Sequence, residues 1–435
     1  MSKKKNILKL ILAVILFFPI YAHAYLDPGT GSALVAAIFG LLGSLLFFSK
    51  NFYYKIKSKF KSEKVSIVQS KLAFLSEGGK YWIYYKGIIE ELIRKKQFFT
   101  YYTMDMEDPA FSLLNFENVK SSKDLNMFDI IFVGKGNIGY ARINNLKEPV
   151  IVTTTPNIGT QGYPISKPKN CKNLIHIFHS ISEVGGYYKN SLDCFDTVIL
   201  SGAEFEDDIR TLEKKRNLPP KKILIGGLPY IDSLIERAAK VDSQTDGKTV
   251  LVASTWNKRG LLKTYGEGLI EKIALAGYNI IVRPHPYSYI YELDFINQLQ
   301  KELASYKNVK FDKEVDNLLS MAKSDIMLSD FSTIRFDYYF IFGRPIISLD
   351  TDFEKYFQEY EYSDLDEFWL FKISYEFGIY LKKEEVFDIV KKIKESINSK
   401  KAKKTKIDKE KIIANIGSSA EVIAEQIMDI CKATN

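Results

Sequence analysis

Cysteine and histidine are scarce in this chain of 435 residues, which contains three cysteines and four histidines. Cys171, Cys194 and Cys431 lie far apart and form no Cys-x-x-Cys pair. The sequence therefore provides neither a zinc knuckle nor a disulfide framework, and it suits a reducing cytosol. One of the histidines, His23, lies in the N-terminal leader, so too few remain for a multi-histidine metal site.

Low-complexity segments and internal repeats are absent as well, whereas hydrophobic residues make up 46% of the chain and include 27 Tyr and 29 Phe. A chain of this composition can bury two ordinary cores. The net charge of +8 is modest, and much of it lies in residues 50–64 and 391–411. No recognised nucleic-acid-binding module lies between these two patches, so we expect no nucleic-acid partner.

Two apolar runs near the N-terminus predict attachment to a membrane. Residues 1–24 have the form of a secretory signal, with three lysines, an apolar run and a small-x-small ending. Residues 32–48 form a second, uncharged run that we interpret as a transmembrane helix, although it is slightly shorter than the roughly 20 residues of a typical span. Lysines and aromatic residues alternate in residues 50–64, which suits an anionic membrane surface or a simple stop-transfer flank.

Positive charge on both flanks of the two runs places both flanks in the cytoplasm. The simplest topology puts residues 50–435 on the cytoplasmic side of the inner (plasma) membrane. Cleavage after Ala24 would leave the second span with the same orientation. The alternative is a cleaved leader followed by a secreted domain, in which residues 32–48 would be part of a soluble core.

Alternating strand-like and helix-like segments in the rest of the chain predict an α/β fold with parallel sheets covered by helices. Residues 65–240 are expected to form a first Rossmann-like domain that binds the acceptor, and residues 249–400 a second one that binds a nucleotide donor. Helical periodicity at 88–98 stands among loops in the first part of this region. Strands are expected at 128–133, 150–154, 174–179, 197–201 and 222–225, and then at 249–253, 279–282, 309–311, 325–328 and 345–349. Two such domains with a cleft between them make a GT-B-like architecture, which residues 401–435 would close with crossover helices.

Two strand ends about 40 residues apart are the most informative part of the sequence. Residues 279–286 read Asn-Ile-Ile-Val-Arg-Pro-His-Pro, an apolar strand that stops abruptly. Residues 329–337 read Ser-Asp-Phe-Ser-Thr-Ile-Arg-Phe-Asp, which indicates a strand end, a tight turn and the start of a helix. Ligands of open α/β sheets bind just outside the carboxyl ends of the strands, and a helix N-terminus attracts phosphate. The two segments therefore predict one shared site for a phosphate-bearing ligand.

Arg283 and His285 in the first segment can both donate hydrogen bonds to phosphate oxygens, and arginine can form two parallel bonds. Pro284 and Pro286 restrict the backbone around His285, so the loop is stiff and holds both side chains in place. The alternative is a proline-rich strand exit with a surface histidine.

Asp330 in the second segment predicts a helix N-cap, which places the hydroxyls of Ser332 and Thr333 in the first turn beside free backbone N–H groups. Asp337 lies one turn beyond Thr333 on the same helix face. A carboxylate in an otherwise apolar helix needs a polar partner, which a donor hydroxyl, a lysine or Arg335 would provide. The alternative is an ordinary capped helix.

These segments resemble the CDP-glycerol glycerophosphotransferase family, whose members build teichoic-acid-like polymers. The family's Arg-Pro-His-Pro and Asp-Tyr-Ser-Ser…Asp motifs are similar to residues 283–286 and 330–337. Further segments that resemble family motifs, in the family's order, are residues 179–180, 223–232, 250–256 and 415–421. The resemblance extends over residues 170–430 and implies a GT-B fold.

The resemblance also implies an enzyme that moves glycerol phosphate, or a related alditol phosphate, from a CDP donor to a hydroxyl of a lipid-linked or glycan acceptor and releases CMP. His179 lies at the family's histidine position and would take the proton of the attacking hydroxyl, a task that suits histidine near neutral pH. His285 is the second catalytic candidate. The implied donor-binding residues are Arg283, Asp330, Ser332, Thr333, Asp337 and Trp256. No metal or other cofactor is expected, because no Asp-x-Asp pair follows a strand of the first domain.

Two other motifs have simpler interpretations. His179 could instead be a hydrogen-bonded core histidine, and His176, which points to the opposite face of the same strand, more readily fits that description. Residues 134–139 match Gly-x-Gly-x-x-Gly, but Pro149 and the next strand arrive too soon for the helix and the acidic residue of a dinucleotide-binding fold.

Two other functions remain open. A GT-B glycosyltransferase or epimerase would use the same strand-turn-helix segment, residues 329–337, to hold the diphosphate of a nucleotide sugar. A membrane-tethered binding protein with a degenerate GT-B body is favoured by one departure from the family, Ser180 in place of glycine after His179. Ser254 replaces the family's proline and Tyr230 its arginine, and the sequence leaves the acceptor, the number of units transferred and the oligomeric state open.

Overall fold

The structure, a computed structural model, describes residues 70–115, 127–243, 248–314, 316–358, 361–375, 378–399 and 408–434. The predicted leader 1–24, transmembrane helix 32–48 and basic segment 50–64 lie outside these residues. Within the described ranges, no helix is long and apolar enough to cross a membrane. The chain divides into two compact units, Met1–Val68 and Gln69–Asn435, and the second contains everything described below.

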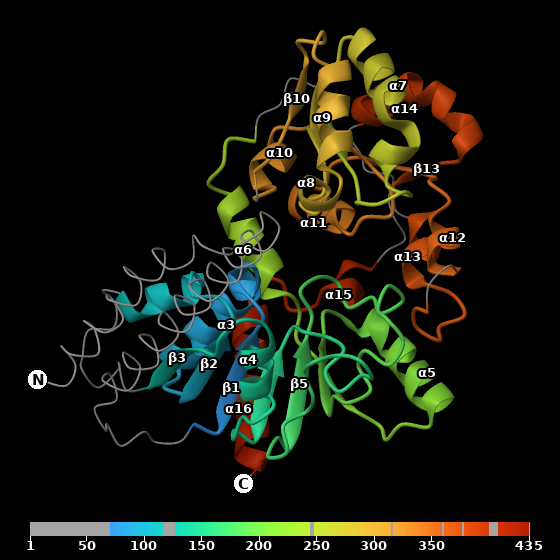
Figure 1. Cartoon of the computed structure of the whole chain (residues 1–435). Coiled ribbons are helices and arrows are strands. Elements are labelled where there is room, and N and C mark those ends of the chain that lie inside the picture. The colour runs from blue at the N-terminus through green and yellow to red at the C-terminus, as the bar shows by residue number, and fades with distance from the viewer. Residues whose placement is uncertain are drawn as a thin grey trace, which may run out of the picture. The chain divides into compact units, whose positions relative to one another are not determined.

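A seven-stranded parallel sheet forms the first lobe of this unit (Figure 1). Its strands, in spatial order, are β3 (Phe128–Phe132), β2 (Phe99–Thr103), β1 (Leu72–Ser76), β4 (Val150–Thr153), β5 (Asn173–Ile177), β6 (Thr197–Leu200) and β7 (Lys222–Ile225). The residues of β1, β4 and β6 are buried throughout, as continuous apolar strands are when helices cover both faces of a sheet. The helices of this lobe are α3 (Trp82–Arg94), α4 (Gly136–Ile143), α5 (Glu206–Arg216) and, from the C-terminus, α16 (Ser419–Ala433).

A six-stranded parallel sheet forms the second lobe. Its strands, in spatial order, are β10 (Val309–Phe311), β9 (Asn279–Arg283), β8 (Thr249–Ala253), β11 (Ile326–Ser329), β12 (Ile346–Leu349) and β13 (Ile379–Leu381). Its helices are α7 (Leu261–Leu275), α8 (Ser288–Tyr291), α9 (Leu293–Glu302), α10 (Leu318–Ala322), α11 (Ile334–Phe342), α12 (Phe353–Gln358), α13 (Trp369–Ser374) and α14 (Ile389–Asn398). The strand order reverses between β8 and β11, and such a switch point is where open α/β sheets bind ligands.

The register of this second sheet brings the predicted motifs to one level. Ala253 at the end of β8 pairs with Arg283 of β9 on one side and with Ser329 of β11 on the other. The loops that follow these three strands therefore leave the sheet side by side at its carboxyl edge. Trp256, His285 and Asp330 all lie in these loops.

The α/β prediction is confirmed, and every expected strand is present with its ends shifted by two residues or fewer. Three strands were not expected: β1, β2 and β13. The helical periodicity predicted at 88–98 belongs to α3, which ends at Arg94, and β2 follows at Phe99. Strand β5 ends at Ile177 rather than at 179, so His179 lies in the loop beyond the strand.

The C-terminal segment returns to the first lobe. Helix α16 packs along α3, where Lys95 forms ion pairs with Glu421 (3.2 Å) and Glu425 (2.6 Å). The short helix α15 (Lys409–Ile412) lies against Gly202, where any Cβ would collide with the backbone of Lys411 and Ile412. Only glycine allows this close approach, which holds residues 409–433 against the sheet that begins the described chain.

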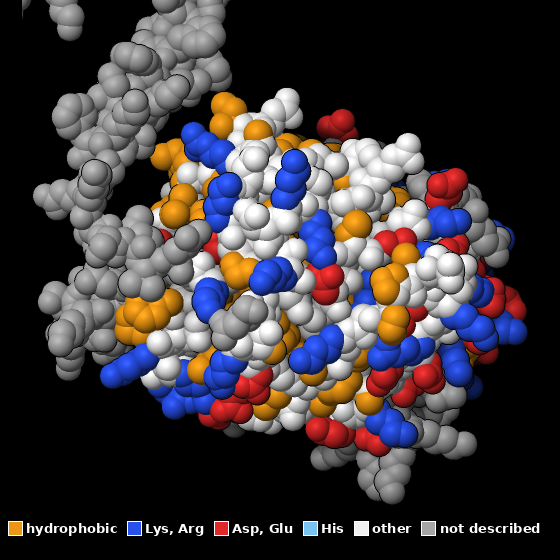
Figure 2. All heavy atoms as spheres, turned by 90° about the horizontal axis from the view of Figure 1, so that it is seen from below, with side chains coloured by type: hydrophobic (Ala, Val, Ile, Leu, Met, Phe, Trp, Pro, Cys, Tyr) orange, Lys and Arg blue, Asp and Glu red, His pale blue; other side chains and the backbone are white. Residues whose placement is uncertain are grey.

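Charges of both signs are mixed on the surface seen from below (Figure 2). Lysine and arginine side chains are spread over this face, and acidic side chains lie among them, mainly toward its rim. This face carries no continuous basic stripe among its described residues, whereas proteins that follow a phosphate backbone generally present one. The expected absence of a nucleic-acid partner stays a prediction.

Candidate functional site

His179 lies two residues beyond the end of β5, in the loop at the carboxyl edge of the first sheet. Its ring centroid is 5.8 Å from that of Tyr84 and 6.3 Å from that of Tyr81. Burial, and then the positive charge of Lys80, lowers the pKa of His179. A lowered pKa keeps the imidazole neutral at neutral pH, which is the form that can accept a proton. Its Nδ1 is enclosed and has no hydrogen-bond partner in the described part of the chain.

His176, by contrast, is a core residue. Its side chain is fully buried within β5, and its ring packs edge-on against Phe178 and Phe195. Burial lowers the pKa of His176 to about 3, so it stays neutral throughout the physiological range. The two histidines thus have different surroundings although only two residues separate them.

Tyrosine side chains connect His179 to the second lobe. Tyr84 packs on Tyr230 at the start of α6 (Pro229–Ala238), with ring centroids 5.3 Å apart. The hydroxyl of Tyr230 lies 3.5 Å from Oδ2 of Asp337 on α11. Burial raises the pKa of Asp337 to about 7, and the hydrogen bond from Tyr230 offsets part of this rise. Residues predicted from both halves of the chain therefore converge where the two lobes meet.

Lys80 provides a second connection between the lobes. It lies in the 3-10 turn η1 (Gly79–Tyr81), just after β1, and its Nζ is 3.2 Å from the hydroxyl of Tyr287 in the second lobe. The ring of Tyr287 is 5.4 Å from that of His285 and 5.4 Å from that of Trp256. Within the described residues, no carboxylate forms an ion pair with Lys80, so its positive charge is available to an anionic ligand near both histidines.

His285 is held in one tautomer by its own loop. Its Nδ1 accepts a hydrogen bond from the backbone N–H of Tyr287 (3.1 Å), so the proton of the neutral ring is on Nε2. Burial lowers the pKa of His285, and the nearby charge of Arg283 acts in the same direction while Glu292 opposes it. A neutral His285 presents an Nε2–H donor, which suits contact with a phosphate oxygen.

The turn between β11 and α11, residues 330–333, differs in detail from the prediction, and we call it the elbow. Asp330 is fully buried, and α11 begins at Ile334 with Thr333, rather than Asp330, at its N-cap position. The carboxylate of Asp330 instead accepts hydrogen bonds from the backbone N–H groups of Thr255 (2.8 Å), Leu261 (2.9 Å) and Ser332 (2.9 Å). Asp330 therefore binds the loops after β8 and β11 to each other, and its contact with a donor stays a prediction.

Ser332 and Thr333 remain half-buried, and their hydroxyls make no hydrogen bond within the described ranges. The two hydroxyls lie at the positive end of α11, where a phosphate group is stabilised by the helix dipole. Their contact with a donor stays a prediction.

Arg283 is turned away from the elbow. Its side chain is buried, its Nη1 forms an ion pair with Asp312, and its Nη2 donates to the backbone carbonyl of Glu314 (2.9 Å). Asp312 also accepts hydrogen bonds from Ser320 and from the backbone N–H of Glu314. The guanidinium thus stabilises the loop after β10, and its contact with a donor phosphate stays a prediction.

Sequence reasoning missed Lys80, Tyr84 and Tyr287. A signal for Lys80 was present, because Leu-Ala-Phe-Leu-Ser at 72–76 is a short apolar run that ends close to two glycines and Lys80. Tyr84 and Tyr287 carried no such signal, since aromatic residues are abundant throughout the chain. In the described part of the chain, no group of three or more His, Cys, Asp or Glu side chains could hold a metal ion.

Comparisons with known proteins bear on this site. Residues 188–429 match the family described as CDP-Glycerol:Poly(glycerophosphate) glycerophosphotransferase. The chain belongs to this family. The matched region contains the elbow, the Arg-Pro-His-Pro segment and Tyr230, so the family resemblance is confirmed over these residues. Residues 179–180 lie outside the matched region, and the role of His179 stays a prediction. A comparison with curated proteins gives no match.

Solved structures support the GT-B-like fold. The wall teichoic acid polymerase TagF is 17% identical, with a TM-score of 0.50, and the alignment covers 91% of this chain and 98% of TagF. The UDP-GlcNAc 2-epimerase from Methanocaldococcus jannaschii is 16% identical, with a TM-score of 0.51, and the alignment covers 82% of this chain and 99% of the epimerase. At these identities the similarity shows the fold, and both lobes are included in it.

Asp337→Asn should change how stability depends on pH. The pKa of Asp337 is raised from its usual 3.8 to about 7 in the folded protein. The folded protein therefore binds the proton of this carboxyl group more tightly than the unfolded chain does. The resulting stabilisation is complete below about pH 4 and is lost as the pH rises through about 7. Asparagine carries no charge at any pH, so the variant should lack this loss. We expect urea titrations of wild type to show a decrease of up to about 4 kcal/mol between pH 4 and 8 that is much smaller in the variant.

Asp294→Asn on α9, which removes an exposed carboxylate, is the matched control and should follow the wild-type curve. An Asp337→Asn curve parallel to wild type would show that this carboxyl group titrates normally.

Proposed function

We propose that this protein is a transferase that moves glycerol phosphate, or a related alditol phosphate, from a CDP donor to a hydroxyl of a lipid-linked or glycan acceptor in cell-envelope polymer synthesis. Family membership supports the reaction class. The observation that carries the proposal for this chain is the convergence of His179, Lys80, His285 and Asp337 where the carboxyl edges of the two lobes meet.

Four side chains and one helix N-terminus have defined tasks in the proposed reaction. Neutral His179 accepts the proton of the acceptor hydroxyl as its oxygen attacks the phosphorus that carries the glycerol. The bond from that phosphorus to the bridging oxygen breaks, and CMP leaves with the electron pair. The hydroxyls of Ser332 and Thr333, the N-terminus of α11 and the Nε2–H of His285 stabilise the negative charge that develops on the diphosphate. We propose that no metal ion is required, because these groups supply the positive potential.

Membrane attachment is part of the proposal. The apolar run 32–48 and the lysine-rich segment 50–64 would hold residues 70–435 at the cytoplasmic face of the inner (plasma) membrane, where a lipid-linked acceptor would be available. The support for this placement comes from the sequence alone.

Release of nucleotide by the purified full-length protein tests the function. CDP-glycerol, CDP-ribitol, UDP-sugars and GDP-sugars would be supplied separately, with and without membrane extract and with and without a chelator, and the released nucleotide would be measured. We expect CMP from a CDP-alditol, insensitive to the chelator and abolished in His285→Ala. Release of UDP or GDP would instead indicate glycosyl transfer or epimerisation, and binding of nucleotide without turnover would indicate the degenerate binding protein.

A further inference from the structure

Arg335 is a buried charge without a carboxylate partner. Its side chain is fully buried at the first turn of α11, and among the described residues no carboxylate forms an ion pair with it. Burial lowers the pKa of Arg335 to about 10, while the charge of Asp330 acts in the opposite direction. A buried guanidinium is costly unless its donors are hydrogen-bonded, so its presence here calls for a specific role.

The Nε end of the Arg335 guanidinium is hydrogen-bonded to the elbow. Its Nε donates to the backbone carbonyl of Ser332 (3.0 Å), whose N–H donates in turn to Asp330 (2.9 Å). The backbone of Ser332 is therefore hydrogen-bonded on both sides: its N–H donates to a buried carboxylate, and its carbonyl accepts from a buried guanidinium. Hydrogen bonds to charged groups are the stronger kind, so this arrangement fixes the position of the neighbouring hydroxyls.

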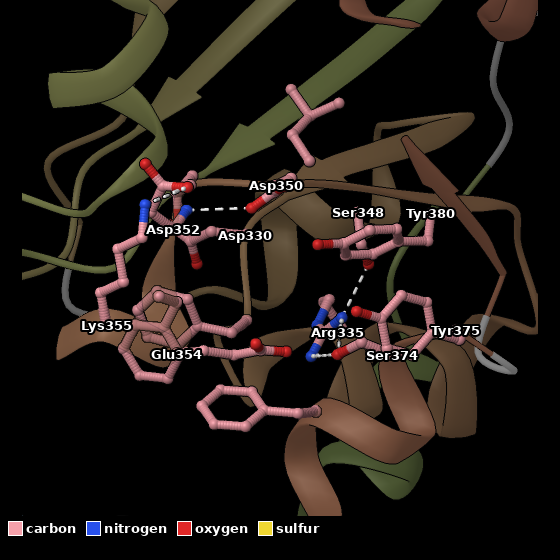
Figure 3. A pocket seen from close by; sticks show the side chains of 15 residues that line it. Asp330, Arg335, Ser348, Asp350, Asp352, Glu354, Lys355, Ser374, Tyr375 and Tyr380 are labelled. Atoms are coloured by element: carbon pink, nitrogen blue, oxygen red, sulfur yellow. Dashed lines mark hydrogen bonds and ion pairs between the residues drawn. The ribbon is translucent and has the colours of Figure 1, made fainter. Parts of the chain in front are cut away.

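The other end of Arg335 reaches β12 and α13 (Figure 3). Its Nη1 donates to the hydroxyl of Ser348 (2.7 Å), and both Nη1 and Nη2 lie 3.2 Å from the hydroxyl of Ser374. Ser374 donates to the carbonyl of Leu370 one turn earlier (2.6 Å), which fixes the direction of its own lone pairs. Arg335 thus connects the elbow to the last turn of α13.

Helix α13 ends a segment that is anchored on the first lobe. We call residues 361–374 the docking segment. Asp364 forms ion pairs with Arg216 (2.7 Å) and Lys189 (3.2 Å) of the first lobe. Trp369 packs on Phe205 with ring centroids 4.9 Å apart, and its indole N–H donates to Glu204 (3.2 Å).

A continuous set of contacts therefore connects the first lobe to the elbow. It passes from Arg216 and Asp364 through the docking segment to Ser374, and from there through Arg335 to Ser332. Each step is a hydrogen bond, an ion pair or the backbone of the docking segment, whose last residues, 369–374, form α13. Contiguous contacts of this kind can carry coupling between distant sites.

We propose that Arg335 is a positioning residue that couples docking of residues 361–374 on the first lobe to the geometry of the donor-phosphate elbow. The proposal rests on the proposed function for the identity of the ligand, but not for the coupling itself. Undocking of the segment would move Ser374, release Arg335 and loosen Ser332. The elbow would then bind a diphosphate well only when the two lobes are engaged.

Hydrogen exchange of the full-length protein tests the coupling without any substrate. Exchange would be followed in peptides covering 326–338 and 361–374 in wild type, Arg335→Met, Arg335→Lys, Asp364→Asn and the surface control Asp294→Asn. We expect Arg335→Met to raise exchange at the elbow at least tenfold, and Arg335→Lys, which keeps the charge but not the forked geometry, to raise it less. Asp364→Asn should raise exchange in both peptides although residue 364 does not touch the elbow. The control should match wild type.

The proposal is overturned if Asp364→Asn raises exchange only in the docking segment, or if Arg335→Lys and wild type have the same elbow exchange. These two variants keep the test decisive even if Arg335→Met does not fold.

Kinetics provide the second readout. We expect Arg335→Lys and Asp364→Asn to raise the donor KM by about tenfold with a smaller change in kcat, and the double variant to show less than the sum of the two effects in free energy. Fully additive effects would contradict coupling through Arg335. If wild type releases no CMP from any CDP-alditol, the proposed function fails, and the exchange experiment still decides the role of Arg335.

Discussion

Replacing His179 with glutamine is expected to lower kcat for CMP release by about 10²- to 10⁴-fold, the usual contribution of a general base. Glutamine retains hydrogen-bonding groups of similar reach but cannot take up the proton of an attacking hydroxyl. Burial and Lys80 lower the pKa of His179, so the wild-type rate should begin to fall only at pH values below the ordinary pKa of histidine. That acid limb should disappear from the residual activity of the variant.

His176→Gln is the matched control for this experiment. It makes the same substitution three residues earlier, at a fully buried site inside β5. We expect it to lower stability, since a flexible amide replaces an imidazole ring that packs on Phe178 and Phe195, while each folded molecule keeps close to wild-type turnover. Equal losses of kcat in the two variants would show that His179 contributes to the fold and not to proton transfer.

Asp330→Ala is expected to lower the free energy of unfolding by about 3–5 kcal/mol, the range found when one partner of a buried charged network is removed. The substitution would leave the backbone N–H groups of Thr255, Leu261 and Ser332 without acceptors inside the protein. It would also remove the opposite charge that acts on the buried Arg335. The measurement is the urea concentration at the midpoint of unfolding, monitored by far-UV circular dichroism, in variants whose m-value is unchanged.

Asp350→Ala offers a comparison at the same place on the next strand. Asp350 follows β12 as Asp330 follows β11, but it is only half-buried. Among the described residues its carboxylate accepts a single backbone hydrogen bond, from Asp352 (2.9 Å). We expect a loss of about 1 kcal/mol. If both alanine variants lost the same amount, Asp330 would be an ordinary strand-end residue and not the point that joins the β8 and β11 loops.

Secondary structure was largely predictable because buried parallel strands are short continuous apolar runs between polar loops. This rule located β8, β9 and β11 and, with them, the loops that carry Trp256, His285 and Asp330. It failed for β2, whose Phe-Thr-Tyr-Tyr-Thr sequence contains threonines and is therefore not a continuous apolar run, and it placed the end of the preceding helix four residues too late. Local pattern gave no strand signal here, because aromatic and threonine residues occur in helices and loops as well as in strands.

The roles of individual side chains were less predictable. Arg283 and Asp330 follow neighbouring strands and both suit a phosphate site, yet Arg283 turns to Asp312 and Asp330 to the loop after β8. Arg335 had no assigned role beyond a partner for Asp337, but in the structure it holds Ser332 and Ser374. Charged groups that leave water pair with whatever donors and acceptors the fold places nearby, and those partners lie far away in the sequence.

The sequence by itself determined the α/β class, the positions of the motifs at strand ends and the family, because hydrophobic period and short motifs are properties of neighbouring residues. Only the tertiary structure decided that Lys80 and Tyr84 lie beside His179, that Tyr230 reaches Asp337, and that the docking segment connects to the elbow. Those contacts join residues that are separated by up to about two hundred positions. They depend on strand order, register and the meeting of the two lobes, which no local pattern specifies.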